Sequence, residues 1–242
     1  MEVHHHSHKP KKISEYFTEF IMLFAAVTLG FFAENYREHQ IEKHREIQYL
    51  KNIHLDLERD IVEIDRIYNL NIEYQQLGNE FIQLYDRGYQ TDLPRFYYLT
   101  KTLALKAYFQ RSQNGIDQLK NAGGMRLIKS SKISDEIANY WHWQEYAKAY
   151  GATTEELKLK ARERSYNIFN QFYYNEISRN EVKTTKSGAQ LMTYDKTVLT
   201  EYANRLSHIK NSIKNQQLYQ LDQILSSATI LLNDLKKEYE VK

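Results

Sequence analysis

The residues best suited to metal chemistry stand at the start of the chain, where His4, His5, His6 and His8 lie close together. Imidazole nitrogens bind transition metals, so this run can form a metal site. It is also typical of a flexible polar tail or of a tag remnant. The sole Glu-x-x-His spacing of helical carboxylate sites is Glu2 with His5, within the same tail. We therefore predict no functional metal and no cofactor.

Motifs of other enzyme classes are absent from the sequence. It contains no His-Glu-x-x-His zinc-protease pattern, no Gly-x-Ser-x-Gly nucleophile elbow and no glycine-rich phosphate loop. The pair Gly123 and Gly124 follows a predicted helix instead of opening one. The absence of cysteine excludes disulfides, thiolate zinc sites, iron–sulfur clusters and cysteine nucleophiles. The sequence therefore indicates a protein that is not an enzyme.

The amino-acid composition indicates which elements build the protein. The 242 residues include two prolines and eight glycines, whereas average usage gives about 12 and about 17. Sandwiches, barrels and doubly wound sheets need frequent turns, and turns use these two residues. The 33 basic and 31 acidic residues are interleaved, and no basic face stands out for nucleic acid. We predict an all-α protein of long helices with no nucleic acid partner.

One strongly apolar run, residues 20–33 (FIMLFAAVTLGFFA), can cross a membrane. Its 14 residues span roughly 21 Å as a helix, and a crossing usually takes about 20 residues. Tyr16 and Phe17 extend the run, and Tyr16 and Tyr36 can lie at the two membrane interfaces as aromatic anchors. We favour a transmembrane helix over a buried core helix or a cleaved signal peptide, whose small-x-small cleavage pattern is missing. The predicted organisation is a tail over residues 1–12, an anchor over residues 13–36 and a helical bundle over residues 37–242.

Basic residues beside the anchor predict its orientation. Lys9, Lys11 and Lys12 precede the apolar run, and Arg37 follows it. Positive charges near a span favour the cytoplasmic side. We therefore expect the amino terminus in the cytoplasm and the bundle outside it, which in a bacterium means an inner-membrane protein with a periplasmic domain.

One helical stripe of the anchor combines small residues with a carboxylate. Small residues four apart let two helices approach closely in lipid, and a carboxylate facing acyl chains is costly. Glu19 is interpreted mainly as an interfacial residue that reaches the headgroups; the alternatives are an oligomer seam or a pore-lining carboxylate. The stripe residues are Glu19, Leu23, Ala26, Gly30 and Ala33.

The first bundle helix carries apolar residues that alternate in spacings of 3 and 4, as coiled coils do. This pattern predicts a second surface for self-association. His54 on it is interpreted as a packed core histidine, whereas Asp56, Glu58 and Asp60 are interpreted as a solvated face. The apolar pattern consists of Ile47, Leu50, His54, Leu57, Ile61, Ile64 and Tyr68.

The breaks between helices follow from glycine, proline and polar stretches. Gly88 and Pro94 mark the first break, and polar residues 178–192 form a candidate loop. A phase shift near Gln216 and Gln217 is typical of a stutter in a coiled-coil repeat. With no glycine or proline between Ala33 and Leu77, the anchor can continue into the first bundle helix. The predicted bundle helices cover residues 37–87, 94–108, 114–122, 132–177 and 195–240.

The segment QLKNAGGMRLI, residues 118–128, has two interpretations. As a structural element it is a helix stop, because glycine past a helix end turns the chain. As a functional element it belongs to a basic contact for an anionic partner such as lipid, cell-wall polymer or an acidic protein face. The basic residues of that contact are Lys120, Arg126, Lys129 and Lys132.

Four stretches also carry a resemblance to known proteins: MEVHHHSH, LGFFAENYREH, QLKNAGGMRLI and LLNDLKKEYEVK. Together they resemble a family of uncharacterised bacterial single-span membrane proteins. The resemblance extends along the chain but is sharp only in these stretches. It implies that the His-rich opening is native and supports one amino-terminal span. It implies no activity and no catalytic residue.

The function expected from the sequence is that of a non-catalytic, membrane-anchored helical scaffold or protein-interaction module of the bacterial cell envelope. Membrane lipid, a second copy of the chain and an envelope protein are the expected partners. One alternative is a ligand-sensing bundle outside the cytoplasm that relays through a partner. The other is an oligomeric pore that uses Glu19.

Overall fold

The computed structural model describes residues 12–105, 112, 114–177 and 188–239. About 89% of these residues are helical and none forms a strand. A single isolated bridge joins Phe169 to Leu191. The predicted all-α class is confirmed. The chain divides into two units, residues 1–48 and residues 49–242, which are described separately.

Helix α1 (Ile13–Gly88) is continuous over 76 residues. The long interval without glycine or proline predicted this continuity, because nothing removes a hydrogen bond or frees the backbone there. The helix ends where Gly88 takes a φ of 103°, a conformation that side chains with a Cβ rarely adopt. The anchor and the first predicted bundle helix are therefore one element.

The first unit contains the apolar part of α1. An 18-residue window there has a mean hydropathy of 1.7, and none of it is buried. Val27, for example, is 73% exposed and Leu23 69% exposed. The chain thus has one described helix that is long and apolar enough to cross a membrane.

The second unit is a helical bundle whose elements begin at recognisable caps. The side chains of Asp92, Ser130 and Asp195 accept hydrogen bonds from backbone N–H groups three residues on, at 3.1, 3.3 and 2.9 Å. Such caps satisfy donors that the first turn leaves unpaired. The elements after α1 are η1 (Tyr89–Asp92), α2 (Leu93–Leu103), α3 (Asn114–Asn121), η2 (Gly124–Leu127), α4 (Ser131–Ser165), α5 (Gln171–Glu176), α6 (Lys196–Ser212), the π-helical η3 (Ile213–Gln217) and α7 (Leu218–Tyr239).

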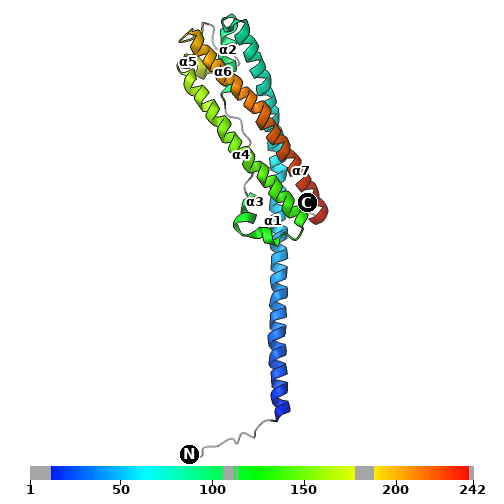
Figure 1. Ribbon diagram of the computed structural model, residues 1–242. Helices are drawn as coiled ribbons and strands as arrows, with labels where there is room; N and C mark the ends of the chain where they lie inside the picture. Colours follow the sequence, from blue (N-terminus) through cyan, green and yellow to red (C-terminus); the bar gives the residue numbers. More distant parts are fainter. Residues whose placement is uncertain (1–11, 106–111, 113, 178–187, 240–242) are drawn as a thin grey trace, which may run out of the picture. The chain divides into compact units, whose positions relative to one another are not determined.

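Helix α4 runs antiparallel to α6 and α7 (Figure 1). At its start, Lys132 Nζ lies 2.6 Å from Asp234 Oδ2 near the end of α7. At its end, Arg164 Nη2 lies 2.7 Å from Glu201 Oε2 near the start of α6. The antiparallel packing predicted for the bundle is thus present between α4 and the helices α6 and α7.

The bundle part of α1 has the same direction as α4. Asp60 contacts Tyr140, and further along both helices Tyr74 lies under the Lys158 ammonium at 5.1 Å. Residue numbers therefore increase in the same direction along α1 and α4. Against α6, Tyr85 Oη lies 2.9 Å from Thr200 Oγ1. Helices α1, α4 and α6–α7 therefore form a three-helix core. Figure 1 shows α2 and α5 near one end of it and α3 near the other.

Two apolar cores lie along these three helices, and Leu70 packs against both. The first is rich in aromatic rings, which bury large areas and pack edge to face. The first core includes Tyr74, Phe81, Phe96, Tyr97, Phe169 and Tyr202. The second includes Leu50, Ile53, Leu57, Ile64, Ile133, Ile137 and Leu231.

The helix predicted over residues 132–177 is instead two helices, α4 and α5. The chain leaves α4 after Ser165 so that Phe169 can enter the first core, where its ring centroid lies 4.8 Å from that of Tyr97. Asn170 then caps α5 by accepting from Phe172 N at 3.0 Å. Core packing thus ends α4 at a point in the sequence, around Ser165, where no glycine or proline stands.

Two further boundaries differ from the prediction. Helix α2 ends at Leu103 and not at 108, because Ala104 turns the chain. The helix predicted over 195–240 is interrupted by the π-helical Ile213–Gln217, where the phase shift predicted a stutter. A π segment adds one residue to a helical turn, and this shifts the phase of the apolar pattern. The candidate loop over 178–192 lies largely outside the described residues.

Candidate functional site

The anchor stripe stays on one side of α1 and is accessible. Leu23, Ala26, Gly30 and Ala33 are exposed, and a Cβ added to Gly30 would meet nothing within 4 Å. Glu19 is partly buried. These residues share one face of a regular helix, so a neighbouring helix can approach them.

The seam predicted within residues 47–68 serves the bundle itself. Leu50, Leu57 and Ile64 are fully buried in the second core, and His54 is 2% exposed, as expected for a packed histidine. Because these side chains face other helices of the same chain, they are not a surface for self-association. This part of the self-association hypothesis is wrong.

The four basic residues of the proposed anionic contact have different environments. The Lys120 ammonium lies 3.3 Å from the centroid of the Trp141 ring, and Lys132 pairs with Asp234 at 2.6 Å. Arg126 and Lys129 are exposed, and Lys129 also interacts within the chain. The contact is therefore not a set of four free cations.

Metal ligation by the amino-terminal histidines cannot be placed, because His4, His5, His6 and His8 lie outside the described residues. Among the residues that the structure does describe, no group of three or more His, Cys, Asp or Glu side chains can hold a metal ion.

Two buried carboxylates of α1 bind backbone N–H groups just before and within the first turn of α3. Asp60 Oδ1 accepts from the backbone N–H of Ser112 at 2.7 Å, and Asp56 Oδ2 accepts from that of Gly115 at 2.6 Å. Asp56 is 4% exposed and Asp60 is 1% exposed, so the prediction of a solvated face is wrong for both. N–H groups at a helix start are unpaired and carry partial positive charge, so they offset the burial of negative charge.

The Asp60 carboxylate also joins α1 to α4. Its Oδ2 accepts from Tyr140 Oη at 2.5 Å and from Gln144 Nε2 at 3.0 Å. Burial raises the pKa of Asp60, and the hydrogen bonds from Tyr140 and Ser112 oppose that rise. Burial, and then the negative charge of Asp60, raises the pKa of Tyr140, which keeps its phenol protonated as the donor. Asp60 thus joins α1 to α4 and to the segment that precedes α3.

Gly115 is required for the close approach of α3 to α1. A Cβ at this position would lie 2.8 Å from Ile53 N, a backbone atom that cannot give way cheaply. We expect Gly115→Ala to lower the free energy of unfolding by about 1–3 kcal/mol, as overpacking does. Gly151→Ala is the control, because nothing lies within 4 Å of a Cβ there, and it should raise stability by up to about 1 kcal/mol. Urea unfolding followed by circular dichroism measures both, and equal effects would contradict this role of Gly115.

A carboxyl pair between α4 and α7 makes stability depend on pH. Burial, and then the neighbouring Asp234, raises the pKa of Glu136 from 4.5 to about 7, while Lys132 opposes the rise and Glu238 adds to it. The folded state therefore holds this proton more tightly than the unfolded state. The stability that Glu136 contributes is complete below pH 4.5 and is lost as the pH rises through about 7.

We expect Glu136→Gln to remove this dependence, because an amide does not ionise. The fall in unfolding free energy between about pH 5.5 and about pH 8 should shrink by about half or more. Unfolding curves across this range measure the effect, with the exposed Glu163→Gln on the same helix as the control. An unchanged slope in the Glu136 variant would show that this carboxyl is not the titrating group.

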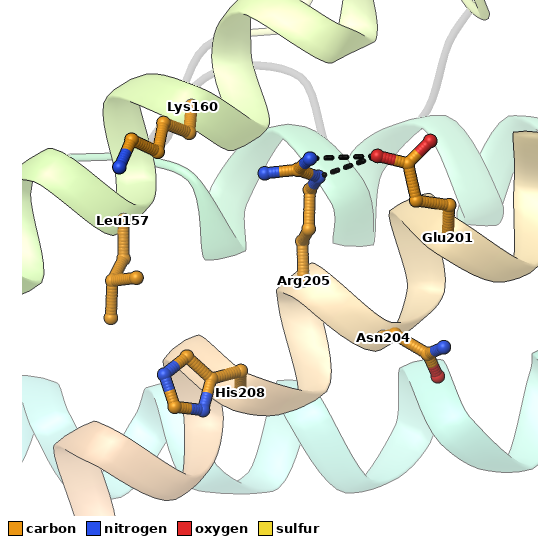
Figure 2. Close-up of a pocket in the computed structure, with 6 residues that line it drawn as sticks. All are labelled: Leu157, Lys160, Glu201, Asn204, Arg205 and His208. Atoms are coloured by element: carbon orange, nitrogen blue, oxygen red, sulfur yellow. Dashed lines mark hydrogen bonds and ion pairs between the residues drawn. The ribbon is translucent and has the colours of Figure 1, made fainter.

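A pocket of about 300 Å³ lies between α4 and α6 (Figure 2). Helix α4 contributes Leu157 and Lys160, and α6 contributes Glu201, Asn204, Arg205 and His208. The Arg205 side chain extends from α6 toward α4 and donates to Glu201 Oε1 from Nε at 3.1 Å and from Nη2 at 2.7 Å. The hydrogen bond from Arg205 lowers the pKa of Glu201, so this carboxyl stays ionised.

Sequence reasoning missed this pocket, because its residues belong to two helices and to no motif. Lys160 lies on α4, whereas Arg205 and His208 lie three positions apart on α6. That spacing places the two α6 side chains on one face. Only the antiparallel packing of α4 and α6 brings Lys160 to the same place.

No protein-family model, no curated protein and no solved structure matches the chain.

Proposed function

We propose that the protein is a non-catalytic, membrane-anchored helical scaffold or interaction module of the bacterial cell envelope. The observation that supports this proposal is the continuity of α1. One helix carries an exposed apolar surface in residues 20–33 and then supplies buried core residues to the bundle, such as Leu57 and Ile64. A membrane contact made by this helix is thus covalently joined to the folded bundle.

The exposed side chains of the anchor support a lipid environment. Phe24 is 59% exposed and Phe31 is 68% exposed. Removing each such side chain from water is favourable by about 1.5–3 kcal/mol, and contiguous apolar patches of this kind mark membrane or protein contacts. Lipid covers the apolar side chains on all sides of a helix at once, whereas a single protein partner covers only one side.

The orientation proposed from the basic residues places the bundle outside the cytoplasm. Lys9, Lys11 and Lys12 precede the span, so the amino-terminal tail stays on the cytoplasmic side of the inner membrane. The partners proposed are membrane lipid, a second copy of the chain and an envelope protein. We also propose that the protein is related to the bacterial single-span membrane proteins that its sequence resembles.

Self-association is assigned to the anchor stripe alone. Ala26 and Gly30 lie four positions apart on its exposed face, and small residues at this spacing allow close helix packing in lipid. The natural chain contains no cysteine, so single cysteines report proximity without background. We expect Ala26→Cys and Gly30→Cys to form disulfide-linked dimers in oxidised membranes.

The controls lie on the opposite face of the same helix. Ile21→Cys and Thr28→Cys face away from the stripe, since helical residues advance by about 100°, and should remain monomeric. Equal crosslinking at all four positions would indicate random collision in the membrane. An absence of dimers at every position would contradict self-association through the anchor.

A further inference from the structure

We propose that the pocket between α4 and α6 is a binding site for a small anionic ligand, recognised by Lys160, Arg205 and His208. These three nitrogen-bearing side chains come from two helices and line one cavity of about 300 Å³ (Figure 2). The proposal depends neither on the anchor nor on self-association. The shared chemistry of the ligand is a carboxylate or a phosphate group.

The Glu201 carboxylate, which already lines the pocket, does not take the place of this anionic ligand. Glu201 is held between two guanidinium groups, with Arg164 Nη2 at 2.7 Å from one oxygen and Arg205 Nη2 at 2.7 Å from the other. Two positive charges thus surround one negative charge and leave a positive balance. Arg205 uses Nε and Nη2 in this contact, and Figure 2 shows its remaining nitrogen on the side toward Leu157 and Lys160.

Lys160 and His208 are accessible to a ligand. The ammonium of Lys160 pairs with Glu156 at 2.6 Å, but both side chains are more than half exposed. Such exposed pairs one turn apart are weak and exchange readily with other partners. His208 is exposed at the pocket wall on α6. An anion can therefore recruit both groups without breaking a buried contact.

The size of the pocket limits the ligand. About 300 Å³ is at the lower end of the range for small-molecule sites. Leu157 offers an apolar contact beside the cations. The pocket thus fits a small organic anion, or the charged end of a longer one. A ligand held there joins α4 to α6 and stabilises the bundle by mass action.

Calorimetric titration of the full-length protein in a neutral detergent tests the proposal. The probes are inorganic phosphate, benzoate and uncharged benzamide, at constant ionic strength. We expect saturable binding of phosphate or benzoate and none of benzamide. Phosphate binding alone would identify a phosphate site, and benzoate binding alone would identify a carboxylate site with an apolar contact.

Variants locate the binding. Lys160→Gln and His208→Gln should each weaken it at least about fivefold, the scale of a lost charged hydrogen bond. Lys148→Gln removes the same charge from an exposed position on α4 outside the pocket and should leave binding unchanged. Melting temperatures without ligand check that all three variants fold. No saturable binding of either anion, or equal weakening by all three variants, would overturn the site.

Discussion

Replacing Asp60 by alanine should lower the free energy of unfolding by about 3–5 kcal/mol, because each buried donor left unpaired costs about 1–3 kcal/mol. Three donors lose their acceptor at once: the Ser112 amide, the Tyr140 hydroxyl and the Gln144 amide group. Burial of the carboxylate, which raises its pKa, offsets part of the loss when it is removed. Urea unfolding followed by circular dichroism measures the change.

Asp65→Ala is the matched control for Asp60. Asp65 lies five positions further along α1 and is exposed, and its carboxylate accepts a hydrogen bond from Asn69 at 3.3 Å. Its removal should change stability by about 0.5 kcal/mol or less, as surface substitutions usually do. If both variants unfold at the same urea concentration, Asp60 does not hold α1, α4 and the segment before α3 together.

Charges in the middle of the anchor should release the chain from the membrane. Each arginine at the centre of a spanning helix costs about 2.5–3.5 kcal/mol, so Phe24→Arg with Val27→Arg costs about 5–7 kcal/mol together. We expect the protein to move from the carbonate-resistant membrane pellet to the supernatant. Immunoblots of the two fractions measure the change.

The control places the same charges further along the same helix. Leu55 and Val62 are 47% and 71% exposed in the bundle part of α1, so arginines there remain in water. The Leu55→Arg and Val62→Arg double variant should stay in the membrane pellet. Release of both double variants would show that the charges disturb folding in general, and retention of both would contradict the anchor.

The sequence predicts the helices well where their ends have local causes. Gly88, Asp195 and the pair Gly123 and Gly124 mark real helix boundaries, because each supplies a cap or a backbone conformation to its own segment. The break after Ser165 has no such signal. It results from the burial of Phe169 among rings that come from α2, α5 and α6.

The register of the first bundle helix shows why polar core residues were missed. The apolar pattern assigned Leu50, Leu57 and Ile64 correctly, and these are buried. The second row of buried positions contains Ile53, Asp60 and Ile67. Asp60 falls in this row with spacings of seven residues, so periodicity alone marks it as buried. A charged side chain was nevertheless expected to face solvent. The partners that stabilise its burial lie more than 50 residues away in sequence, so the local pattern does not reveal them.

The candidate pocket is the part that sequence reasoning could not reach. Lys160 and Arg205 are ordinary surface residues of their own helices, and each has a carboxylate partner one turn away. Their shared cavity exists because α4 and α6 pack in opposite directions at one register. Registers between distant helices depend on core packing, which a single sequence pattern does not specify.

The most direct test of a membrane-anchored bundle outside the cytoplasm is cysteine labelling in cells. On the proposed topology, Ser7→Cys and Val62→Cys place one thiol on either side of the span, in a chain without other cysteines. A maleimide that cannot cross the inner membrane is added after the outer membrane is permeabilised. The account predicts labelling of Val62→Cys at once and of Ser7→Cys only after the inner membrane is lysed. Labelling of Ser7→Cys first, or of both thiols together, would contradict it.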